Sequence, residues 1–302
     1  MSISRRKFLT WLSTAGVGTA FCPMGTAESG DPASGNKNGL AMDCFAILHD
    51  ISLCIGCRTC EAACNEVNHL PIPLQSFSDI SVLDQERRTT PDNVTIVNRY
   101  DNLESSDKPV FRKIQCNHCL SPACVSACFV KALNKTDSGP VVYDPSICVG
   151  CRYCMVACPF DIPAYEFYRP FNPRIVKCDM CAPRIEKGLL PACVASCPRE
   201  ALIFGKRSII LKTAREYIRK YPNRYIDHIY GEKEMGGTSW LYISNVPFHE
   251  LGMKENLGHL PAASLTAGGF GIVPMVLGIW PVLLTGLYAI TRQAETIGDS
   301  DD

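Results

Sequence analysis

The spacing of the cysteines constrains this chain more than any other feature of its sequence. Of 18 cysteines in 302 residues, sixteen fall into four short runs, and only Cys22 and Cys44 stand outside them. The first and third runs have the spacing C-x2-C-x2-C-x3-C, the second has a middle gap of four residues, and the last has a middle gap of eleven. The runs are Cys54, Cys57, Cys60 and Cys64; Cys116, Cys119, Cys124 and Cys128; Cys148, Cys151, Cys154 and Cys158; and Cys178, Cys181, Cys193 and Cys197.

Three chemistries gather cysteines in this way: disulfide bonds, zinc sites and iron–sulfur clusters. Disulfides are disfavoured because Cys-x-x-Cys pairs form strained bridges, and because a chain with 46% hydrophobic residues can build a core without them. A structural zinc site takes two short knuckles separated by a longer loop. The first and third runs instead place three cysteines within seven residues. A non-redox protein with structural zinc is the alternative from another functional class.

Iron–sulfur clusters fit the spacing. Three closely spaced cysteines supply thiolates to three irons of one cubic cluster, and the fourth thiolate comes from elsewhere in the chain. Pro159 and Pro198 follow the last cysteines of the third and fourth runs, as in bacterial ferredoxins, whereas Asn65 and Phe129 depart from that motif in the other two. Sixteen thiolates divide into four [4Fe–4S] clusters without remainder. Cys44 is then expected to be a small buried residue.

The segment between the second and third runs predicts a β-hairpin, because Asp137 to Pro140 has turn residues and Val141 to Tyr143 reads as a short strand. A ferredoxin crosses between its two clusters through such a hairpin, so 116–163 is predicted to be a complete two-cluster ferredoxin. A second ferredoxin would surround it, from 44–115 (with an insertion) and 164–259 (with a C-terminal extension). The predicted fold class is α+β: two nested ferredoxin-like modules plus one C-terminal transmembrane helix.

Three other features carry weaker signals. Residues 65–115 are polar and punctuated by prolines, which predicts a surface excursion or a docking lobe. Ile210, Ala214 and Ile218 have helical spacing before Pro222, which predicts a helix packed on the core. His118 lies between two cysteines of the second run. Its side chain is expected either to donate a hydrogen bond to sulfur or to occupy an exposed loop position.

The N-terminus has the features of an export signal. Arg5 and Arg6 precede an uncharged, moderately apolar stretch, and small residues follow near Ala27. The paired arginines followed by Phe8 and Leu9 resemble the twin-arginine signal. We therefore expect a twin-arginine signal peptide over 1–27 and a linker over 28–43; an ordinary secretory signal and an uncleaved anchor are the alternatives.

The C-terminal segment has no charged residue between His259 and Arg292. A helix from Gly268 to Ile290 would be about 34 Å long, which exceeds the roughly 30 Å of a bilayer's hydrocarbon core. This predicts a transmembrane helix over 266–290 that anchors the protein in the membrane, with 291–302 as a cytoplasmic tail.

The cysteine pattern resembles that of the four-cluster ferredoxin subunits in the DMSO-reductase and formate-dehydrogenase electron-transfer group. Within that group the chain most resembles the HybA-type subunits of hydrogenase-2-type [NiFe] uptake hydrogenases. The resemblance covers nearly the whole chain. It is carried by the signal "SRRKFL", by the C-terminal apolar segment, and by the stretches "CVGCRYCMVACPF", "LPACVASCPREALIFGKR" and "YGEKEMGGTSWLYISNVPF".

This resemblance implies how the ligands pair. The last cysteine of each run is expected to join the cluster of another run. The implied clusters are cluster 1 (Cys54, Cys57, Cys60, Cys197), cluster 2 (Cys178, Cys181, Cys193, Cys64), cluster 3 (Cys116, Cys119, Cys124, Cys158) and cluster 4 (Cys148, Cys151, Cys154, Cys128).

The resemblance also implies a function. The chain would be a non-catalytic, electron-transfer iron–sulfur subunit at the periplasmic face of the inner membrane. Electrons would come from the large and small subunits of a [NiFe] uptake hydrogenase and leave to a multi-span membrane subunit that reduces quinone. The alternative is the same role in a molybdoenzyme, such as formate dehydrogenase or an anaerobic reductase, or in a sulfur-metabolism complex. A net charge of zero gives no basic surface for nucleic acid.

Overall fold

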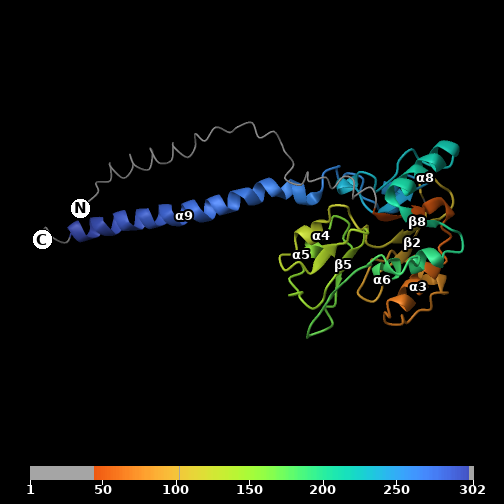
Figure 1. Ribbon diagram of the computed structural model, residues 1–302, viewed down its shortest axis with the longest axis horizontal. Coiled ribbons are helices and arrows are strands. Elements are labelled where there is room, and N and C mark those ends of the chain that lie inside the picture. Colours follow the sequence, from red (N-terminus) through yellow and green to blue (C-terminus); the bar gives the residue numbers. More distant parts are fainter. Residues whose placement is uncertain (1–43, 102, 299–302) are drawn as a thin grey trace. The chain divides into compact units, whose positions relative to one another are not determined.

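The computed structural model describes residues 44–101 and 103–298 (Figure 1). The chain divides into two units, of which the first comprises Asn38–Thr266. The predicted signal peptide (1–27) and linker (28–43) lie outside the described residues. The described strands and the four cysteine runs all belong to the first unit.

The described elements are mostly short, and they mix helices with strands as the α+β class requires. The strands are β1 (Phe45–Asp50), β2 (Ile96–Tyr100), β3 (Val110–Ile114), β4 (Leu133–Lys135), β5 (Val141–Tyr143), β6 (Ala164–Tyr165), β7 (Ile175–Val176), β8 (Leu202–Lys206) and β9 (Trp240–Ile243). The α-helices are α3 (Thr59–Val67), α4 (Ala123–Ser126), α5 (Tyr153–Val156), α6 (Ala182–Glu186), α7 (Ala192–Ala195), α8 (Arg207–Lys220) and α9 (Ala262–Gly298). Short 3-10 helices lie at Ile51–Leu53, Ile80–Asp84, Glu234–Gly236 and Phe248–Leu251.

The middle strand of the three-stranded sheet is β1, in the order β8–β1–β9. It runs antiparallel to β8 and parallel to β9. Successive side chains of a strand point to opposite faces, so Ala46 and Leu48 enter the core beneath α8 while Ile47 packs with Trp240 in a second core. Because β1 leads into the first cysteine run and β8 follows the fourth, their pairing brings these two runs together.

The helix predicted before Pro222 is confirmed as α8, which ends at Lys220. Ile210, Ala214 and Ile218 recur at helical spacing, and all three are buried against the sheet. Figure 1 shows α8 beside β8. The helix thus covers the face of the sheet opposite to the one that packs with Trp240.

The hairpin predicted between the second and third runs is also confirmed. Val141 to Tyr143 forms β5, which pairs antiparallel with β4. The backbone N–H of Thr136 closes the turn by donating to the carbonyl oxygen of Pro140 at 2.8 Å. The helices before and after this hairpin in the chain, α4 and α5, pack against each other, and α3 packs against α7. The second run therefore lies beside the third, and the first beside the fourth, which is the nested order that the sequence predicts.

Residues 65–115 are only partly the surface excursion that their composition suggests. Ile72 and Leu74 are exposed, but β2 and β3 pair antiparallel, and Ile96 and Val97 are each 1% exposed. The prediction failed for this second half because a two-stranded ribbon needs few apolar residues when its buried face packs against helices. This ribbon supports α3, as described below.

A helix, α9, occupies the segment predicted to cross the membrane (266–290), and it continues into the predicted cytoplasmic tail (291–302) as far as Gly298. The side chains of 266–272 and 274–275 lie outside the described residues. In the part of the chain that the structure describes, no helix combines the length and apolar character that crossing a membrane requires. The helix is thus confirmed, whereas its predicted passage through a bilayer is not.

Candidate metal centres

The sixteen cysteines of the four runs are free thiols, and the fold gathers them into four groups of four. Sets 1, 2 and 4 each line a cavity. In set 3, burial first and then the three other thiols of the set raise the pKa of Cys119. The members are set 1 (Cys54, Cys57, Cys60, Cys197), set 2 (Cys64, Cys178, Cys181, Cys193), set 3 (Cys116, Cys119, Cys124, Cys158) and set 4 (Cys128, Cys148, Cys151, Cys154).

These sets coincide with the four implied clusters, although ligation itself stays a prediction. Within the described residues, no three ligating side chains converge closely enough to hold a single metal ion. In sets 1, 2 and 4 the thiols instead surround a shared cavity. A cubic cluster needs such an arrangement, because each of its four irons takes one thiolate from a different direction.

Each run makes the same turn before its second cysteine. The residue at that position has a left-handed backbone, with φ of 70° at Gly56, 47° at His118, 70° at Gly150 and 59° at Met180. In the third and fourth runs this turn aims a backbone N–H at the first sulfur of the run. The N–H of Gly150 donates to Cys148 Sγ at 3.4 Å, and that of Met180 donates to Cys178 Sγ at 3.3 Å. Such donors stabilise thiolate sulfur, and glycine adopts this backbone without strain.

The third cysteine of each run is always the second residue of a short helix. Runs with middle gaps of different length therefore present this cysteine in the same way. In the two runs with longer gaps, the residue before the helix is an extended proline, Pro122 or Pro191. Proline is favoured at such a helix start because its ring already fixes φ. The cysteines in question are Cys60 in α3, Cys124 in α4, Cys154 in α5 and Cys193 in α7.

Burial disfavours the ionised form of several of these thiols. It raises the pKa of Cys54, Cys154 and Cys181 to about 11, and that of Cys64 and Cys124 to about 12. A cationic iron centre that binds such thiols as thiolates must displace their protons. The sites are therefore suited to a positively charged metal core and poorly suited to free thiolates.

The four sets follow one another in the order 1–2–3–4. Sets 1 and 2 are neighbours because α3 carries Cys60 and Cys64 and because Lys113 lines both cavities. Sets 3 and 4 are neighbours because Cys124 and Cys154 pack in one core cluster. The pKa shifts of the thiols agree with this order. Burial is the largest cause of each shift, and a thiol of the next set adds to it: Cys193 raises the pKa of Cys60, Cys116 that of Cys178, and Cys154 that of Cys124.

Three buried ring side chains near the sets have a nitrogen with no partner among the described residues: His49 Nδ1, His118 Nε2 and Trp240 Nε1. His49 lines the cavity of set 1, and Trp240 lines that of set 2. Buried polar atoms are rarely left unpaired. A cluster in each cavity would bring sulfur acceptors to these nitrogens, so the surroundings of the sets fit iron–sulfur clusters.

His118 is 0% exposed, so the prediction of an exposed loop position is wrong. Its Nδ1 accepts a hydrogen bond from the backbone N–H of Val141 at 2.9 Å, which leaves the proton of the neutral ring on Nε2. Burial, followed by the charges of three neighbouring lysines, holds the pKa of His118 well below its ordinary value. The neutral ring is thus a fixed N–H donor beside set 3.

Two buried lysines, Lys113 and Lys177, and the half-buried Lys135 provide positive charge around the sets, and no sequence pattern marks any of them. Lys135 donates to the carbonyl oxygens of His118 and Gly139, and Lys177 donates to those of Val141 and Cys178. The third, Lys113, lines the cavities of both set 1 and set 2. Burial would lower the pKa of Lys113, but the sulfurs of sets 1 and 2, once they carry negative charge, hold it above its ordinary value.

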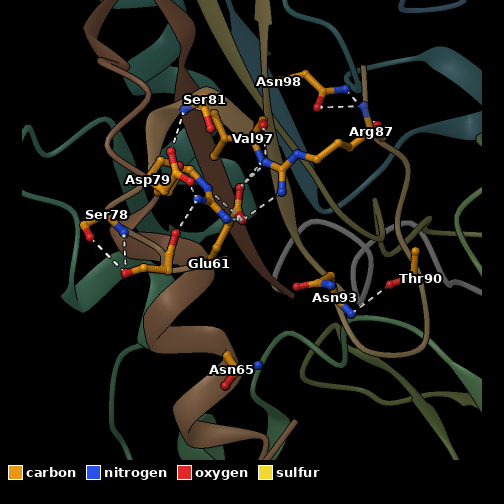
Figure 2. Close-up of polar contacts among 12 residues, drawn as sticks. Glu61, Asn65, Ser78, Asp79, Ser81, Arg87, Thr90, Asn93, Val97 and Asn98 are labelled. Carbon is orange, nitrogen blue, oxygen red and sulfur yellow. Dashed lines mark hydrogen bonds and ion pairs between the residues drawn. The ribbon is translucent and has the colours of Figure 1, made fainter. Parts of the chain in front are cut away.

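A buried carboxylate, Glu61, fixes the helix α3 that carries ligands of sets 1 and 2. Its side chain is 1% exposed. Figure 2 shows the guanidinium of Arg87 and the backbone of Val97 converging on it. The N–H of Val97 donates to Glu61 Oε1 at 2.7 Å, and Arg87 Nη2 donates to the same oxygen at 2.7 Å. Arg58 Nη2 donates to Oε2 at 3.1 Å.

The two arginines extend this network to the rest of the insertion. Arg58 Nη1 donates to the carbonyl oxygens of Ser76 and Asp79 at 3.0 and 2.7 Å. Arg87 Nη2 also donates to the carbonyl oxygen of Val97 in β2 at 2.6 Å. One carboxylate on α3 therefore organises the loop before β2 and the strand itself.

Known proteins are similar to this chain along most of its length. A 4Fe-4S dicluster domain matches residues 108–207. A protein of Nitratidesulfovibrio vulgaris is 55% identical over 98% of this chain and 79% of its own length. The hydrogenase-2 operon protein HybA of Escherichia coli is 33% identical over 84% of both chains. The formate dehydrogenase-O iron–sulfur subunit of Escherichia coli is 32% identical over 82% of this chain and 80% of its own length.

The fold and the four cysteine sets define an electron-transfer iron–sulfur protein of ferredoxin type. The chain belongs to the family of 4Fe-4S dicluster proteins that includes HybA and the formate dehydrogenase iron–sulfur subunits. The resemblance to this wider group is confirmed, and so are [4Fe–4S] clusters as the class of cofactor. The narrower hydrogenase-2 assignment is not decided by similarity, because the two Escherichia coli relatives are 33% and 32% identical to the chain.

Proposed function

We propose that this chain conducts electrons through four [4Fe–4S] clusters, one held by each cysteine set. The observation that carries the proposal is the assembly of sixteen cysteines from four separate runs into four groups of four, with neighbouring groups in the order 1–2–3–4. When bound, the clusters would accept and pass on single electrons. The chain's own residues position the sulfurs and bury positive charge beside them.

The exposure of the sets suggests where electrons enter and leave. Cys57 of set 1 and Cys151 of set 4 are exposed, while the thiols of sets 2 and 3 are buried or half-buried. Sets 1 and 4 are also the two ends of the order given above. We infer that each end exchanges electrons with a partner protein and that sets 2 and 3 connect them.

For the partners, we propose the large and small subunits of a [NiFe] uptake hydrogenase as electron donor and a multi-span quinone-reducing membrane subunit as acceptor. Similarity to HybA along most of both chains supports this choice. A molybdoenzyme such as formate dehydrogenase is the second candidate, because the formate dehydrogenase-O iron–sulfur subunit is similar over nearly the same length.

Anaerobic purification of the complex tests both levels of the proposal. We expect about sixteen irons per chain and broad visible absorption, together with nickel in the co-purified catalytic subunit. Molybdenum in place of nickel would favour the second candidate. A colourless protein that contains zinc and no iron would contradict the electron-transfer function itself.

We further propose export by the twin-arginine route to the periplasmic face of the inner membrane. The support is Arg5 and Arg6 followed by Phe8 and Leu9. Replacing both arginines by lysine is expected to retain the protein in the cytoplasm, because the paired guanidinium groups are the distinctive part of the signal. Cell fractionation measures this, and unchanged periplasmic accumulation of the double variant would contradict the proposal.

A further inference from the structure

Lys113 is a buried cation with little compensation from the protein. Its residue is 2% exposed. Its Nζ donates to Gln115 Oε1 at 2.9 Å and lies 4.5 Å from the ring centroid of Trp240. Among the described residues, no carboxylate pairs with Lys113, and two of its three N–H donors have no hydrogen-bond partner. An ammonium removed from water in this way needs a counter-charge.

Four other cations of the described chain, three of them buried and Lys135 half-buried, are better compensated. Lys135 and Lys177 each donate to two backbone carbonyl oxygens. Arg58 pairs with Glu61, and the guanidinium of Arg207 donates to three carbonyl oxygens. Lys113 differs from all four because its protein partners are one amide oxygen, from Gln115, and the ring face of Trp240.

The position of Lys113 indicates where its counter-charge lies. The residue lines the cavity of set 1 and also the cavity of set 2. Among the residues that the structure describes, it is the one that lines both cavities. Its neighbour Gln115 is held in turn, because Gln115 Nε2 donates to Tyr242 Oη at 2.7 Å. The ammonium is therefore fixed between the two sets.

We propose that Lys113 is a positioning residue for charge, a counter-cation shared by the clusters of sets 1 and 2 that holds both at a more positive reduction potential. This inference rests on the proposed function. Reduction adds one electron to a cluster whose four thiolates already make it anionic, and a nearby fixed positive charge stabilises the reduced form more than the oxidised form. Lys113 stays an ammonium throughout, so no proton moves and no bond changes.

A redox titration of the cluster-loaded complex, followed by EPR, tests this inference. In Lys113→Gln, the reduction potentials of two of the four clusters are expected to become more negative. At a fixed applied potential, the ratio of reduced to oxidised cluster should fall at least tenfold, which corresponds to about 59 mV for one electron. Lys113→Arg keeps the charge and is expected to stay within threefold of the wild type. The matched control is Lys108→Gln, which removes the same charge from an exposed position just before β3.

The second variant, Gln115→Glu, keeps the lysine and places a carboxylate against its Nζ. It is expected to shift the same two clusters in the same direction. If Lys113→Gln fails to take up iron, this variant decides the question. Three outcomes would overturn the proposal. The potentials could stay unchanged in an iron-loaded Lys113→Gln or Gln115→Glu protein, or all four clusters could shift by the same amount. The third outcome is loss of iron from both Lys113→Arg and Gln115→Glu. A wild-type protein without iron would instead overturn the proposed function.

Discussion

Glu61→Ala is expected to destabilise the protein by about 3–5 kcal/mol, the usual loss when one partner of a buried ion pair is removed. The substitution leaves the Arg58 guanidinium, whose side chain is 3% exposed, without a carboxylate. It also removes the acceptor of the backbone N–H of Val97. The side chain of Arg87 is 20% exposed and can turn toward water, so it adds less to the loss.

Anaerobic urea denaturation, followed through the visible absorption, measures this effect. A shift of the midpoint on the order of 1–2 M to lower urea is expected. Glu66→Ala removes the same charge from an exposed position on the same helix, and it is expected to change stability by no more than about 0.5 kcal/mol. Equal midpoints for the Glu61→Ala and Glu66→Ala proteins would show that the buried network does not hold α3.

The consequence for the metal centres follows from geometry. Cys60 and Cys64 lie on α3 on either side of Glu61, and they belong to sets 1 and 2. A helix that loses its attachment to β2 shifts one ligand of each set. Destabilisation of α3 should therefore make the clusters of these two sets more labile than those of sets 3 and 4.

The identity of the candidate ligands was predictable from sequence because the relevant information is local. The cysteines Cys148, Cys151 and Cys154 line one cavity through a single turn and a single helix start, and their spacing records that path. The longer middle gaps of the second and fourth runs hide this path in the sequence. Only the structure shows that Pro122 and Pro191 return the chain to the same helix start.

The surroundings of the sets were not predictable for the opposite reason. Lys113 and Glu61 are single charged residues, and no periodic pattern distinguishes them from solvent-exposed charges. Their burial results from contacts across long stretches of chain, such as the pairing of β2 with β3 over α3. The surface expectation for the second half of 65–115 is wrong for the same reason, whereas Ile72 and Leu74 in the first half are exposed. Lys113 alternates with Arg112 and Ile114 along a strand whose buried face the sequence does not reveal.

The predicted membrane helix illustrates another limit. An uncharged stretch correctly indicated a helix at 266–290. A long uncharged stretch favours an apolar environment, but no helix in the described part of the chain meets the requirements of a membrane span. Cysteine spacing was the stronger signal because thiolate ligation demands particular residues at particular positions, whereas apolar composition is shared by several kinds of helix.

The pairing of ligands gives the prediction with the most specific outcome. Cys60 and Cys64 are four residues apart on α3, but they line different cavities. Single replacement of either cysteine by alanine is expected to remove about four of about sixteen irons, because a [4Fe–4S] cluster needs its four thiolates. Alanine is preferred to serine since a serine oxygen can still bind iron. Iron analysis and EPR of the reduced proteins measure the loss.

The two variants should lose different EPR signals. Cys64→Ala is expected to lose the signal that Cys178→Ala also loses, since both cysteines belong to set 2. Cys60→Ala is expected to lose the same signal as Cys54→Ala, from set 1. Cys44→Ala, which replaces a buried cysteine outside the four sets, serves as the control and should retain all signals. If the Cys60 and Cys64 variants lost the same signal, each run would hold its own cluster, and the exchange of last cysteines between the first and fourth runs would be wrong.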